Sequence, residues 1–83
     1  MYKFISIARY PSDVWSTSMY IYQNIDTNKY YISRMFPVSS RFLGSNLVDT
    51  TNYNLIEYPM EISNDDLNKK TIKYFGLEWK FNI

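Results

Sequence analysis

The sequence predicts an α+β fold: a small, mostly antiparallel sheet of four to five strands with one helix packed on a face. Three observations favour this class. Several short segments are rich in β-branched and aromatic residues, which suit strands. One segment after Ser63 combines a capping residue with helical periodicity. The length of 83 residues suits a single compact domain, 1–83. The expected order of elements is β-β-β-β-α-β.

The first expected strand is Tyr2–Arg9, which alternates loosely between apolar and polar residues. It ends before Pro11, because proline removes a ladder donor and favours extended backbone in the residue before it. Residues 11–15 are then expected to form a turn or one short helical turn, with Ser12 as a candidate cap.

A hairpin of Ser18–Ile25 and Tyr30–Val38 is the clearest strand pair, and residues 26–29 supply its turn chemistry. With Thr27 and Asn28 at the tip, one face is mostly aliphatic and the other is rich in tyrosine. The expected register places Ile25 opposite Tyr30, Gln23 opposite Ile32, Ile21 opposite Arg34 and Met19 opposite Phe36. A slip of one residue would exchange the two faces.

The middle of the chain, residues 39–52, is weakly patterned, and we expect either a functional loop or a short helix before Gly44. The following segment, Tyr53–Ile62, resembles a strand in composition. Pro59 favours an edge position for that strand, because proline cannot donate to a neighbouring strand.

A helix is expected from Ser63 to Phe75, because Ser63 and Asp66 form a variant of the capping box. Leu67, Thr71, Tyr74 and Phe75 would share one helical face, and Gly76 would provide the left-handed residue after the helix. The last segment, residues 77–83, alternates strictly. We expect Leu77, Trp79, Phe81 and Ile83 to face the core, with Trp79 and Phe81 contributing most to it.

Composition excludes several kinds of chemistry. The chain has no cysteine and no histidine, so it can form neither a disulfide nor a thiolate or imidazole metal site, and it lacks the commonest general acid–base residue. No motif for a nucleophile, a calcium loop or a phosphate-binding loop is present. We therefore expect a non-enzymatic protein without a cofactor. The apolar runs are too short for a signal peptide or a membrane span, which favours a cytoplasmic location.

The function we expect is protein binding. A small domain without catalytic groups can act as an inhibitor or adaptor that occludes a site on a partner, and the AT-rich coding bias suggests a phage or mobile element as its source. The tyrosine-rich hairpin face would carry the interaction, since tyrosine and arginine are enriched at binding hot spots. The candidate partner-binding residues are Tyr20, Tyr22, Tyr31 and Arg41, the last because it stands in the long loop.

Two other functions stay open. A nucleic-acid-binding domain could use a lysine strip at Lys69, Lys70 and Lys73 with tyrosines as stacking platforms, although a net charge of +1 makes this the weaker alternative. A small carboxylate-dependent hydrolase is the second alternative. A homodimer is a further expectation, because a domain of this size has a thin core and exposed strand edges.

Overall fold

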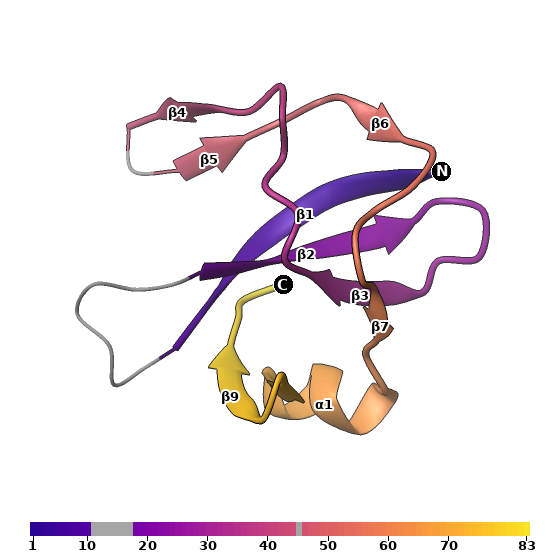
Figure 1. The fold of residues 1–83 in the computed structure, drawn as a ribbon, viewed down its shortest axis with the longest axis vertical. Coiled ribbons are helices and arrows are strands. Elements are labelled where there is room, and N and C mark those ends of the chain that lie inside the picture. The colour runs from indigo at the N-terminus through magenta and orange to yellow at the C-terminus, as the bar shows by residue number, and fades with distance from the viewer. Residues whose placement is uncertain (11–17, 45) are drawn as a thin grey trace.

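The computed structural model describes residues 1–10, 18–44 and 46–83, and these form a β-rich domain around one curved sheet (Figure 1). Of the described residues, 49% lie in strands and 8% in a helix. Six strands make a nearly closed, barrel-like sheet, and a single short helix lies beside it. The predicted α+β class, with a helix packed on the face of a four- to five-stranded sheet, is therefore wrong.

The elements in chain order are β1 (Tyr2–Arg9), β2 (Ser18–Asn24), β3 (Tyr30–Ser33), β4 (Arg41–Leu43), β5 (Asn46–Val48), β6 (Asn52–Tyr53), β7 (Met60–Glu61), α1 (Asn64–Lys69), β8 (Thr71–Tyr74) and β9 (Leu77–Lys80). The main sheet runs β7-β3-β2-β1-β9-β8, and β6 also pairs with β1. The hairpin of β4 and β5 forms a second, two-stranded sheet above β1 (Figure 1). All of these pairings are antiparallel.

The larger core cluster lies on the inner side of the curved sheet and contains the two residues expected to dominate it. Trp79 is 1% exposed and Phe81 is 4% exposed. The other buried members are Ala8, Met19, Ile21, Ile32, Ile62, Ile72 and Tyr74. Leu77 and Ile83 are exposed instead of buried, because the regular strand ends at Lys80 and only its middle faces the interior.

A smaller core cluster covers the opposite face of β1, β2 and β3, where the tyrosines lie. Phe4, Tyr22 and Ile56 are buried there, and partly buried aromatic and aliphatic side chains pack around them. Leu47 from β5 and Tyr53 from β6 belong to this surrounding layer. The weakly patterned middle of the chain therefore folds over the tyrosine-rich face and shields it from water.

A β-bulge in β1 explains why its sequence alternates only loosely. The pairing with β2 shifts register between Phe4 and Ser6, so that Ile5 is an extra residue without a partner in β2. Phe4 pairs with Tyr22 before the shift and Ile7 pairs with Tyr20 after it. Because of this extra residue, Phe4 and Ile7 lie on the same face of the sheet although they are three residues apart.

The predicted hairpin and its turn are confirmed, but its register and the length of its second strand are not. Asn28 has a φ of +61° at the tip, and the amide of Asn24 donates to the carbonyl of Lys29. Gln23 pairs with Tyr30 and Ile21 with Ile32, which is two residues away from the expected register. A shift of two preserves both faces, so the division into aliphatic and tyrosine-rich faces is correct. The second strand, β3, ends at Ser33 rather than at Val38.

The predicted helix begins where expected but ends after only six residues. Ser63 caps α1 by accepting a hydrogen bond from the amide of Asp66, as the sequence predicts. The helix stops at Lys70, whose φ of +58° is left-handed, and the chain then enters the β8–β9 hairpin. Phe75 and Gly76, with φ of +52° and +73°, form its two-residue turn. Gly76 has the expected left-handed backbone, but it lies in the turn of a hairpin and not at the end of a helix.

Substitution of the helix cap provides a test of α1. Replacing Ser63 by Ala removes the acceptor for the Asp66 amide, and we expect a loss of about 1 kcal/mol in the free energy of unfolding. Chemical denaturation measures this loss. Ser63→Asp, which retains an acceptor at the cap, is expected to stay within ~0.5 kcal/mol of the natural protein. Equal losses in both variants would show that the cap does not act as described.

Two predicted segments in the middle of the chain differ from the structure, although β7, which follows Pro59, lies at an edge of the main sheet as expected. Residues 39–52 contain the β4–β5 hairpin and the start of β6, rather than the expected loop or a short helix before Gly44. The expected strand Tyr53–Ile62 is divided into β6 and β7, with the chain bending between them at Tyr58, whose φ is +45°. The predicted turn at residues 11–15 lies outside the described residues. Among the described residues, no helix is long and apolar enough to cross a membrane.

Candidate functional site

The middle of β1 is an open strand edge. On the side away from β2, β1 pairs with β6 only at Tyr2 and Lys3, and with β9 only at Arg9. Across the ranges that the structure describes, residues 4–8 have β2 as their only strand partner. Successive residues of a strand point their backbone groups to opposite sides, so this stretch presents N–H and C=O groups without a strand partner to its free side. Within it, the hydroxyl of Ser6 donates to the carbonyl of Ile7 at 3.4 Å.

A groove of about 490 Å³ follows this open edge. Its floor is β1, from Phe4 to Arg9. One wall comes from β5, through Asn46 and Leu47, and the other from the end of the chain, through Phe81 and Asn82. The groove is therefore a slot between the β4–β5 hairpin and the segment after β9, and it exposes the backbone that another strand would pair with.

Tyr22 does not belong to any accessible site, although the sequence nominated it. Its side chain is fully buried, and its hydroxyl donates a hydrogen bond to the carbonyl of Met35 at 2.5 Å. The rings of Phe4 and Tyr53 meet it edge-on, with centroids 6.0 and 5.9 Å away. Burial is the main cause that raises the pKa of Tyr22 well above its usual range, with a further contribution from Tyr53. Tyr22 is thus a core residue, and a partner could not reach it.

Tyr20 and Tyr31 are each partly buried by neighbouring rings. Tyr20 packs edge-on against Phe36 with centroids 5.3 Å apart, and Tyr31 packs against Tyr2 at 5.6 Å. Burial raises the pKa of Tyr20, and the charge of Arg9 opposes this increase. Both tyrosines therefore contribute to the layer over the sheet, with only part of each side chain left accessible.

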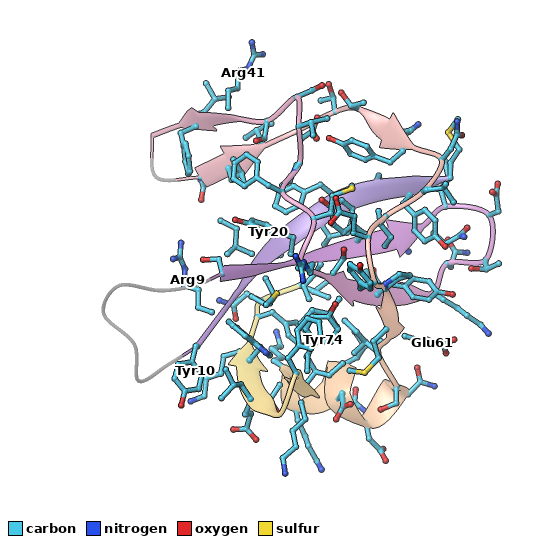
Figure 2. The ribbon with its side chains drawn as sticks, viewed as in Figure 1. Arg9, Tyr10, Tyr20, Arg41, Glu61 and Tyr74 are labelled. Atoms are coloured by element: carbon cyan, nitrogen blue, oxygen red, sulfur yellow. The ribbon has the colours of Figure 1, made fainter. Side chains whose placement is uncertain are left out.

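Arg41 lies far from the tyrosines with which the sequence analysis grouped it. It is exposed on β4 and points away from the domain, whereas Tyr20 lies near the middle of the molecule (Figure 2). The structure thus does not bring the four predicted residues together into one surface. Their role in partner binding stays a prediction, and the peptide affinity of Arg41→Glu tests it for Arg41.

The predicted lysine strip is also dispersed. Lys69 ends α1, Lys70 caps it and Lys73 lies on β8, so the three do not follow one helical face. The neighbouring groove between β7 and β8 is lined by cations and carboxylates alike, including Glu61, Asp66 and Glu78. This mixture of charges does not make a continuous surface for a phosphate backbone.

A polar cluster joins the middle of the chain to β6. Tyr53 donates a hydrogen bond from its hydroxyl to Asp49, and the amide of Thr51 donates to the same carboxylate at 2.9 Å. Burial acts to raise the pKa of Asp49, but these hydrogen bonds outweigh it and hold the pKa below its usual value. Asp49 is thus an ionised structural acceptor. In the described part of the chain, no group of three or more carboxylates is arranged to hold a metal ion.

Sequence reasoning missed the groove because its parts come from three separate segments. The loose alternation within Tyr2–Arg9 was the one available signal, since a bulge often marks a place where strand pairing ends. Comparisons with protein-family models, with curated proteins and with solved structures found no match. The candidate site is therefore defined by its geometry alone.

Proposed function

We propose that this chain is a small protein-binding module, which adds an extended segment of a partner to the open edge of β1. The observation that carries the proposal is the unpaired stretch of residues 4–8 along a groove. Addition of a strand to a free sheet edge is a recurrent mode of peptide recognition, in which main-chain hydrogen bonds provide affinity.

The walls of the groove support an extended peptide rather than a compact ligand. Asn46 and Asn82 are exposed polar side chains on opposite walls, and the half-buried Leu47 adds apolar surface, whereas Phe81 is 4% exposed and adds little. A bound strand would alternate its side chains between the two walls, because successive residues point in opposite directions. By occupying a segment of its partner in this way, the module would act as an inhibitor or an adaptor.

The proposal is tested with a display library of random peptides selected on the full chain. Asn46→Trp places a bulky ring on the groove wall, and we expect it to weaken selected peptides at least about tenfold, or ~1.4 kcal/mol. Asn68→Trp is the matched control, because Asn68 is exposed on α1 away from the groove. This variant is expected to bind within about twofold of the natural chain.

Hydrogen exchange locates the bound peptide independently. Amides within residues 4–8 that face the groove should exchange rapidly in the free protein and become protected when the peptide adds its hydrogen bonds. Protection confined to another surface, or equal loss of binding in Asn46→Trp and Asn68→Trp, would contradict the proposal. A selection that yields no specific peptide would also count against it.

A further inference from the structure

Two cations face each other at the end of the groove. Arg9 on β1 and Lys80 on β9 are the directly opposed residues of the single bridge between these strands, and both are exposed. Like charges in direct cross-strand opposition destabilise a sheet. The ion pairs found among the described residues join the N-terminus to Asp26 and Lys29 to Glu61, so within this part of the chain neither Arg9 nor Lys80 has a carboxylate partner.

The groove carries one positive charge and no negative charge among the residues that the structure describes. Arg9 is the charged residue of this lining, and no described aspartate or glutamate belongs to it. Lys3 lies just beyond the other end of the open stretch, where β1 pairs with β6. A strand that enters this slot therefore meets positive charge at both ends of the edge.

We infer that the partner is an extended, acidic segment of another protein, with an Asp or Glu side chain placed beside Arg9 and Lys80. This inference rests on the proposed function, and it adds the chemistry of the partner. A carboxylate at this position would relieve the repulsion between the two cations and would form charge-assisted hydrogen bonds with Arg9. Charge complementarity of this kind also accelerates association and discriminates against basic partners.

Charge also disfavours a second copy of the chain as the occupant. Two β1 edges paired antiparallel would bring Arg9 of one copy towards Lys3 of the other, at both ends of the interface. Such an arrangement adds like-charge contacts to the existing opposition of Arg9 and Lys80. The groove therefore suits an acidic heterologous segment better than self-association.

The composition of peptides selected from the display library tests this inference. We expect enrichment in Asp and Glu and depletion of Lys and Arg, with affinity that falls as salt concentration rises. Arg9→Glu should weaken a selected acidic peptide by roughly fivefold or more. The same variant should keep or raise the melting temperature, because a carboxylate opposite Lys80 forms an attractive pair in place of a repulsive one.

Arg41→Glu is the matched control for charge. It makes the same change in net charge on the exposed outer side of β4, and we expect acidic peptides to bind it within about twofold of the natural chain. A larger loss in Arg41→Glu than in Arg9→Glu would overturn the inference and would favour the surface around Arg41.

The outcomes separate the inference from the proposed function. Neutral or basic peptides that bind in the groove, and are lost in Asn46→Trp, would overturn the acidic partner while leaving the binding module intact. A concentration-dependent mass in light scattering that Asn46→Trp abolishes would identify a second copy as the occupant and would also overturn it. If no selected peptide loses affinity in Asn46→Trp, the proposed function itself is contradicted.

Discussion

Trp79→Ala is expected to lose about 3–5 kcal/mol in the free energy of unfolding. The indole is 1% exposed, it packs against the ring of Tyr10 at 5.9 Å, and its Nε1–H donates to the carbonyl of Tyr74 at 2.9 Å. A domain of this length has a total stability of roughly 4–12 kcal/mol, so the loss would remove at least about a quarter of it. Denaturation followed by circular dichroism measures the effect without relying on the deleted fluorophore.

Two further variants keep this prediction interpretable. Trp79→Phe retains a ring but removes the hydrogen bond to Tyr74, so we expect a smaller loss that can be measured even if the alanine variant does not fold. Leu55→Ala removes an apolar side chain that is 81% exposed, and it should change stability by less than ~0.5 kcal/mol. Similar losses for Trp79→Ala and Leu55→Ala would contradict the position of Trp79 in the barrel interior.

Tyr22→Ala is expected to destabilise the protein by about 3–5 kcal/mol, as a large side chain is removed from the smaller core. This reverses the expectation for an exposed binding residue, whose removal would weaken a complex and leave the melting temperature nearly unchanged. Thermal and chemical denaturation distinguish the two cases. A folded Tyr22→Ala variant of unchanged stability would show that the middle of the chain does not cover this face.

Tyr22→Phe separates the ring from the hydroxyl. It removes the hydrogen bond to Met35 and should cost about 1 kcal/mol near neutral pH. The pH dependence provides the control. Burial raises the pKa of Tyr22 in the folded protein, whereas the unfolded chain ionises near pH ~10. The folded state therefore binds more protons above that pH, and stability falls as the pH rises. Phenylalanine does not ionise, so the stability of Tyr22→Phe should fall less steeply above pH ~10 than the stability of the natural protein.

The sequence predicted correctly those features that depend on neighbouring residues. The first strand matches its predicted bounds, the Asp26–Lys29 turn lies where its composition indicates, and Ser63 caps a helix. Trp79 and Phe81 are buried as the alternation predicts, although Leu77 and Ile83, which belong to the same alternation, are exposed. Both faces of the first hairpin were also correct, since a register error of two residues leaves the faces unchanged.

The course of the chain from Lys70 to Gly76 shows where local reasoning reached its limit. Helical spacing continues past Lys69, but the same segment also alternates as a strand, with Ile72 and Tyr74 buried. Pairing of Ile72 with Trp79 buries both in the larger core, and this tertiary gain outweighs local helix propensity. Gly76 supports a left-handed backbone in either structure, so its presence could not distinguish them.

The candidate site depends on tertiary structure to a greater degree. The sequence by itself determined that the chain lacks cysteine and histidine, that it contains a tyrosine-rich sheet face, and that Trp79 faces inward. Only the tertiary structure decided that the middle of the chain covers those tyrosines, and that β6 and β9 leave residues 4–8 of β1 open between them. These arrangements join segments far apart in the sequence, and the pairing of distant strands is determined by global packing rather than by local pattern.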